Sequence, residues 1–224
     1  MSEFLPTLPV LATFSLAGLL LAITPGPDMT LFLGRTLAQG RAAGLATLAG
    51  TSFGTMIHTV LAVAGISALL AASPTGFWML KIAGALYLLW LAFQSIVKRS
   101  TFALNHDSPA TGARPQAEPM RHIIMRNALM GLGVNLLNPK VVIFYMTFLP
   151  QFMAADDPNA WKIMLFLGLF YTPLTVPPMV TMILAADRVA HILKSKPIVS
   201  RAIDWLFGTV FAVFAIRILM TEGR

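Results

Sequence analysis

The sequence predicts an all-α, polytopic membrane protein, and three observations lead to that fold class. Of its 224 residues, 57% are hydrophobic and only 11% are charged, whereas a soluble domain carries about 25% charged residues. The apolar residues gather into segments of about 20 residues, which is the length that crosses a bilayer as a helix. The basic residues gather in the connections between those segments. We therefore expect the lipid bilayer to be the main surrounding of this chain.

Six apolar segments are long enough to cross the membrane. They cover residues 8–24 with an extension to about 37, 44–72, 76–97, 127–152, 161–186 and 202–220. We expect a single domain, 1–224, in which two halves of three helices are joined by a linker. The first half is 1–97, the polar cytoplasmic linker is 98–126, and the second half is 127–224.

The distribution of Lys and Arg predicts the orientation, because cytoplasmic connections carry the excess of these residues. Connections one, three and five hold most of the sixteen basic residues, and connection two holds none. The basic positions in these three connections are Arg35, Arg41, Lys98, Arg99, Arg114, Arg121, Arg126, Arg188, Lys194, Lys196 and Arg201. We expect these connections to face the cytoplasm and both termini to face outward. The net charge of +7 then reflects membrane topology, and no nucleic-acid partner is expected.

The first apolar segment is broken by Pro25, Gly26 and Pro27, which Asp28 follows directly. Proline removes a backbone donor and clashes with the preceding turn. Unpaired backbone groups are not tolerated in lipid, so such a break survives only where protein or water satisfies it. One interpretation is a binding site. The other is a helix that ends at the membrane surface, with Pro27 opening the next helix and Asp28 complementing its dipole.

A second break occurs in the fourth segment, at Asn138, Pro139 and Lys140 in "VNLLNPKVVIFYMTFLPQ". Both breaks fall in the first segment of a three-segment half. Because three is odd, the second half must enter the membrane from the opposite side. The sequence therefore predicts two inverted three-helix repeats with broken first helices. Matching interruptions in the two halves point to the binding site of a transporter.

Four motifs, in this order, resemble the LysE/RhtB family of amino-acid exporters. They read "TPGPDM", "QGRAAGLATLAGTSFGTMIH", "KIAGALYLLWLAFQS" and "NLLNPKVVIFYMTFLPQF". The resemblance covers nearly the whole chain. It implies export of an amino acid or a close derivative across the bacterial inner membrane, driven by the proton motive force. It does not say which amino acid is exported.

The candidate residues for substrate binding and coupling are Pro25, Gly26, Pro27, Asp28, His58, Asn138, Pro139 and Lys140. Asp28 leads, because an acid inside the membrane costs roughly 2.5–3.5 kcal/mol and is by default a functional hypothesis. It would hold a substrate ammonium, carry the coupling proton, or both. Lys140 would pair with Asp28, hold a substrate carboxylate, or extend to the interface. His58 would relay a proton or serve as a hydrogen-bonded structural residue.

Two further groups have mainly structural interpretations. Gly40, Gly44, Gly50 and Gly54 are expected to be positions where helices pack closely. Pro173, Pro177 and Pro178 predict a third interruption, in the fifth segment, which would act as a hinge, line a cavity, or form an ordinary kink.

The sequence argues against several other functions. It has no nucleophile elbow, no metal-ligand spacing and no phosphate loop, so we expect no enzyme, no metal and no cofactor. Cysteine is absent, which excludes disulfides and thiolate sites. The alternative function is export of a metal cation or another small ion on a related scaffold, which would call for more acids within the membrane. The oligomeric state stays open, and a homo-oligomer is one of its possibilities.

Overall fold

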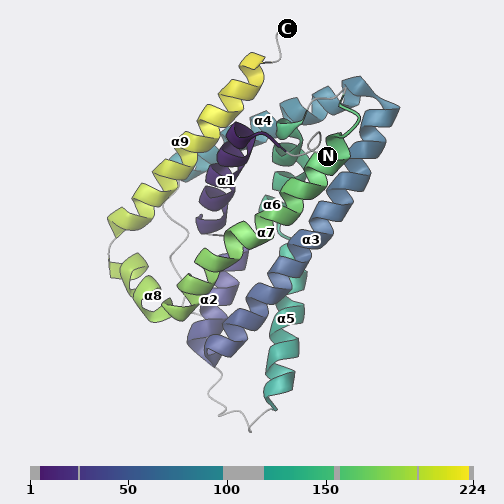
Figure 1. Cartoon of the computed structure of the whole chain (residues 1–224). Coiled ribbons are helices and arrows are strands. Elements are labelled where there is room, and N and C mark those ends of the chain that lie inside the picture. The colour runs from purple at the N-terminus through teal and green to yellow at the C-terminus, as the bar shows by residue number, and fades with distance from the viewer. Residues whose placement is uncertain (1–5, 25, 98–118, 154–156, 196, 222–224) are drawn as a thin grey trace.

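The computed structural model is a bundle of helices (Figure 1). It describes residues 6–24, 26–97, 119–153, 157–195 and 197–221, and those residues form helices and turns without any strand. The all-α prediction is therefore confirmed. Pro25 and residues 98–118, the larger part of the predicted linker, lie outside the described residues.

The first half contains a broken helix followed by two long ones. Its helices are α1 (Leu8–Ile23), α2 (Pro27–Gln39), α3 (Arg41–Ala72) and α4 (Pro74–Val97). Helix α1 ends at Thr24, whose extended backbone leaves the helix while its N–H still bonds the carbonyl of Leu20. Helix α2 begins with Pro27, at the helical position where the missing N–H of proline is not needed. The two helices meet at an angle of 53°.

The second half opens with a similar break. Its elements are α5 (Met120–Leu136), α6 (Pro139–Ile143), a π-helical turn η1 (Phe144–Phe148), a 3₁₀ turn η2 (Leu149–Phe152), α7 (Ala160–Leu184), α8 (Ala186–Ser195) and α9 (Pro197–Thr221). The segment 120–136 and the segment 140–152 meet at 56°. Helix α5 begins before the predicted start at 127. Helix α8 lies where we expected only a connection.

The described helices are long and apolar enough for a multi-pass membrane protein. Among the described residues, α3 over Arg41–Ile66 and α7 over Ala160–Leu184 could each cross a bilayer alone. The two bent pairs raise the number to four if each counts as one span. The arrangement as six spans in two inverted repeats goes further than this and remains a prediction.

Helices α3 and α5 cross at a point where both carry glycine. A Cβ on Gly50 would collide with the backbone of Ala128, and a Cβ on Gly131 would collide with the backbone of Thr47. Small residues let helix backbones approach closely in membranes, where packing drives helix association. This contact fixes α5, and with it the second break, against the first half of α3.

The predicted close-packing role is right for three of the four glycines. Gly44 lies against Thr36 of α2, Gly50 lies against α5, and Gly54 lies against the side chain of Asn135. Gly40 is different, since no atom lies within 4 Å of the position its Cβ would take. Its backbone φ of 91° is the reason for glycine there, because it ends α2 in a conformation that other residues rarely adopt.

The break predicted at Pro173, Pro177 and Pro178 was wrong as an interruption of the helix, whereas the alternative of a cavity lining agrees with the structure, because Tyr171, Thr175 and Met179 of this stretch line a cavity. Helix α7 continues from Ala160 to Leu184 with all three prolines inside it. Membrane helices tolerate proline because neighbouring helices and Thr or Ser hydroxyls support the affected backbone.

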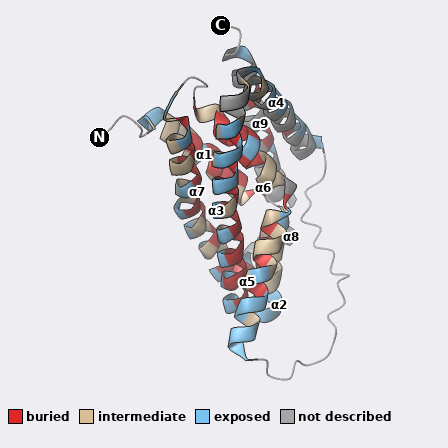
Figure 2. Cartoon of the chain, turned by 90° about the vertical axis from the view of Figure 1, so that its right-hand side faces the viewer, coloured by how far each residue is buried: buried red, intermediate tan, exposed pale blue. Residues whose placement is uncertain are grey.

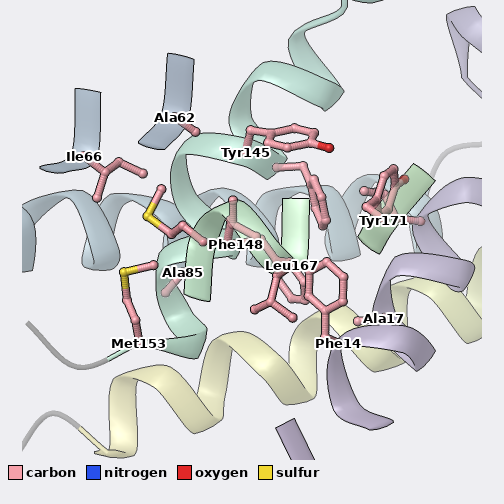
Figure 3. Packing of buried hydrophobic residues seen from close by; sticks show 14 of the residues in the cluster. Phe14, Ala17, Ala62, Ile66, Ala85, Tyr145, Phe148, Met153, Leu167 and Tyr171 are labelled. Atoms are coloured by element: carbon pink, nitrogen blue, oxygen red, sulfur yellow. The ribbon is translucent and has the colours of Figure 1, made fainter. Parts of the chain in front are cut away.

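The larger buried cluster joins α1, α3, α4, η1 and α7, and aromatic rings from α1, η1 and α7 pack within it (Figure 3). Phe14 of α1 lies at its centre, with ring centroids 6.3 Å from Phe148 and 6.4 Å from Tyr171. Figure 2 shows buried residues along the inward sides of the helices and exposed residues outside. Many of the exposed residues are large and apolar, such as Phe53, Val60 and Leu61 of α3, as a lipid-facing surface requires.

Candidate functional site

A cavity of about 80 Å³ lies where the two helix breaks meet. This volume is several times the roughly 10–15 Å³ that one water molecule needs on the same measure. Its lining includes Gly26 and Asp28 from the first break and Asn138 and Lys140 from the second. In Figure 1 both breaks lie about half-way along the bundle. Four of the eight predicted residues, Gly26, Asp28, Asn138 and Lys140, thus line the cavity. Pro27 and Pro139 open α2 and α6 next to them.

The carboxylate of Asp28 is held by two amides from the second half. The side-chain amide of Asn135 donates to one oxygen over 2.6 Å, and that of Asn138 donates to the other over 3.0 Å. Asp28 lies in the first turn of α2, where the partial positive charge of the helix favours an anion. Hydrogen bonds to a charged group are stronger than neutral ones, so this carboxylate is firmly positioned.

Asn138 has two roles at once. Its side-chain oxygen accepts from the backbone N–H of Lys140 over 3.1 Å, so it caps α6. Its nitrogen donates to Asp28. Asn138 therefore caps α6 and holds Asp28 at the same time. Pro139 opens α6 directly after the cap, as Pro27 opens α2.

Lys140 reaches into the first break. Its ammonium donates to the carbonyls of Leu21 and Thr24, each over 2.9 Å. These carbonyls belong to the end of α1, where the helix leaves acceptors unpaired and where its dipole favours a cation. Gly26 lies alongside, because a Cβ there would be 3.6 Å from the Lys140 nitrogen. The side chain points into the protein, so the interpretation of an interfacial lysine was wrong.

His58 contacts two residues of the cavity lining, Asn135 and Tyr145. It is buried, and its Nε2 is 3.3 Å from the backbone carbonyl of Asn135. Because a carbonyl only accepts, Nε2 carries the hydrogen in this contact. The ring stacks on Tyr145 with centroids 5.8 Å apart. His58 does not itself line the cavity, and it reaches Asp28 only through Asn135.

Sequence reasoning missed Asn135. The residue is buried near the end of α5, and Gly54 of α3 leaves the space that its side chain fills. Its side-chain oxygen has no hydrogen-bond partner among the described residues. The available signal was a strongly polar side chain in the apolar run "GLGVNLLNP", three positions before the break.

Two tyrosines in the cavity lining were missed as well. Tyr145 comes from the π-helical turn η1 and Tyr171 from α7, and their ring centroids are 6.2 Å apart. Both lie in apolar runs where an aromatic residue carries no distinctive pattern. A π-helical turn is rare and is found mostly at functional sites, and the 3.6-residue period gives no indication of it.

The rest of the lining is largely apolar. Met29 and Phe32 of α2, Leu48 of α3 and Met179 of α7 all reach the cavity. Their neighbours Thr55 and Thr175 also line it, and each hydroxyl donates to a carbonyl of its own helix. The cavity thus joins a small charged region to a larger apolar one. Across the described part of the chain, no group of three or more His, Cys, Asp or Glu is arranged to hold a metal ion.

Comparison with known proteins shows the family of this chain. Residues 19–222 match the family described as LysE type translocator. The leucine efflux protein of Enterobacter sp. (strain 638) is 27% identical over 206 residues, which cover 92% of this chain and 93% of that protein. The leucine efflux protein of Klebsiella pneumoniae is 27% identical over 211 residues, covering 94% of this chain and 95% of that protein.

A third relative is matched over a shorter stretch. The membrane protein YrhP of Bacillus subtilis is 34% identical over 134 residues, which cover 60% of this chain and 63% of that protein. No solved structure matches the chain. Because the family match extends over most of the sequence, this chain belongs to the LysE type translocators and is a membrane transporter.

Proposed function

We propose that the protein exports an amino acid or a close derivative across the bacterial inner membrane, driven by the proton motive force. The observation that carries the proposal is the position of Asp28 in a cavity between two helix breaks, with the Lys140 ammonium in the same cavity. Membership of the translocator family and two relatives named for leucine efflux support it.

An amino acid is a zwitterion, so its site needs a negative and a positive partner. Asp28 supplies the negative partner for the substrate ammonium. The first turn of α2 opens on the cavity and supplies free backbone N–H groups for the substrate carboxylate. The apolar lining around Met29, Phe32 and Leu48 suits an uncharged, apolar side chain, in keeping with the names of those relatives.

Coupling follows from competition for Asp28. Each carboxylate oxygen has more than one lone pair, so Asp28 can accept from Asn135 and Asn138 and still accept from a substrate ammonium. A proton that binds the carboxylate from the acidic outer side removes its charge and releases the substrate outward. Loss of that proton to the cytoplasm restores the charge for the next substrate.

The proposal includes the arrangement in the membrane. The six segments form two inverted halves of three helices, and the connections after the first, third and fifth segments face the cytoplasm. The rival function of a metal-cation exporter is not favoured by any contact around Asp28. Its carboxylate receives amide N–H donors, and the cavity already contains the ammonium of Lys140.

The test is export from cells and from proteoliposomes, scored with L-leucine and the other amino acids. We expect Asp28→Asn to reach the membrane at normal levels and to lose proton-driven export, since Asn keeps the shape and removes the charge. Asp187→Asn, on the exposed side of α8, is the matched control and keeps export. An Asp28→Asn protein with wild-type export and a wild-type response to a collapsed proton gradient would overturn the proposal.

A further inference from the structure

We propose that the Lys140 ammonium occupies the ammonium site of the empty transporter, and that the substrate binds by displacing it. The inference rests on the proposed function, because it states how that site is filled before a substrate arrives. It assigns to Lys140 the role of an internal competitor, which differs from holding the substrate carboxylate.

Lys140 uses hydrogen-bond acceptors that a substrate ammonium would also use. The ammonium takes two carbonyls from the end of α1, those of Leu21 and Thr24. Leu21, Thr24 and Asp28 all line the cavity. Backbone acceptors at a helix end and a nearby carboxylate are what any primary ammonium requires, since it carries three donors and no acceptor. A substrate ammonium that enters the cavity meets the same acceptors.

Asp28 and the end of α1 are hydrogen-bonded by different side chains of the second half. Asn135 and Asn138 hold Asp28, whereas Lys140 holds the end of α1. Displacement of the Lys140 ammonium therefore leaves the carboxylate in position for the substrate. It also removes the two hydrogen bonds between Lys140 and the end of α1, which connects the arrival of the substrate to the first break.

Lys140 has a fixed backbone and a flexible side chain. Its backbone N–H is fixed by the cap of α6, over 3.1 Å to the Asn138 oxygen. Its side chain is a flexible four-carbon stem, so the ammonium can leave the carbonyls while the backbone stays in place. Gly26 has no side chain beside the stem and leaves room for this movement.

The experiment compares two probes on the purified full-length protein in lipid nanodiscs. The probes are L-leucine and 3-methylbutylamine, which is leucine without its carboxylate. We expect Lys140→Met to bind 3-methylbutylamine about tenfold more tightly than the wild type, because the competitor that it removes makes two charge-assisted hydrogen bonds. Lys140→Gln is the second variant and gives the same direction. Lys162→Met, at the start of α7 beside Trp161, is the matched control and leaves binding unchanged.

The opposite result has a clear meaning. If Lys140 held the substrate carboxylate, its removal would weaken L-leucine binding and leave amine binding unchanged. Unchanged, weaker or absent amine binding by both Lys140 variants overturns the inference. Failure of the proposed function gives a different result from failure of this inference. If the proposed function is wrong, the wild-type protein exports no amino acid, whatever the amine affinities of the two Lys140 variants are.

Discussion

The side-chain amide of Asn135 donates to the carboxylate of Asp28 over 2.6 Å, although the two residues are 107 positions apart in the chain. This contact connects the end of α5 to the start of α2. It brings a residue from each half of the chain into one cavity. Asn135 is thus one of the two residues that hold Asp28 in position, and the first prediction follows from this contact.

Replacement of Asn135 by Leu should reduce export per molecule by about tenfold or more, since Asp28 loses a charge-assisted hydrogen bond and its fixed orientation. The stability cost is about 1–3 kcal/mol, as for other buried hydrogen bonds that lose a partner. The matched control is Asn127→Leu, on the same helix and outside the cavity, where the amide donates to Gln39 and to the Ile123 carbonyl. Transport assays normalised to membrane levels separate the two effects. Equal loss of export in both variants would mean that Asn135 acts through stability alone.

The crossing of α3 and α5 predicts a contrast between two glycines of one helix. Gly50→Ala should destabilise the protein by about 1–3 kcal/mol, because the added methyl meets the backbone of Ala128. Gly65→Ala should be neutral or stabilising by up to about 1 kcal/mol, because nothing lies within 4 Å and alanine favours the helix. Thermal unfolding in detergent checks both. A Gly50→Ala protein as stable as Gly65→Ala would contradict the close crossing.

The predicted orientation can be tested with reporter fusions. A reporter that is active only in the cytoplasm should be active when fused near Arg114, which lies outside the described residues, and silent when fused near Asp157. The physical reason is the excess of Lys and Arg in the third connection. A second reporter, active only outside the cytoplasm, should give the reverse pattern at both positions. Activity near Asp157 in the cytoplasmic assay would reject the orientation and, with it, the inverted arrangement of the halves.

The two breaks could be predicted because their cause is local. Proline and glycine interrupt a helix wherever they stand, and an acid or a lysine inside an apolar run carries a cost that needs a reason. The contact between Asp28 and Asn138 also agrees with what the matched breaks suggested. The functional roles of these residues remain predictions that the proposed variants would test.

Other features could not be predicted because tertiary packing decides them. Asn135 and Tyr145 are polar residues within apolar runs, and only the fold brings them to the cavity. Sequence alone does not separate a glycine needed for packing, such as Gly50, from one needed for its backbone angle, such as Gly40. Helix α8 was assigned to a connection because its Lys and Arg residues were counted as signals of membrane orientation. Basic residues occur equally in a loop and on the polar face of a short amphipathic helix, so their count does not separate the two.

The three prolines of α7 have a mechanical consequence. Pro173, Pro177 and Pro178 cannot donate backbone hydrogen bonds, so a short stretch of one long helix lacks three of the bonds that stiffen it. Tyr171, Thr175 and Met179, from the same stretch, line the cavity. The part of α7 that lacks these backbone hydrogen bonds is therefore also the part that lines the cavity. Bending of α7 there would change the volume of the cavity without breaking the helix elsewhere.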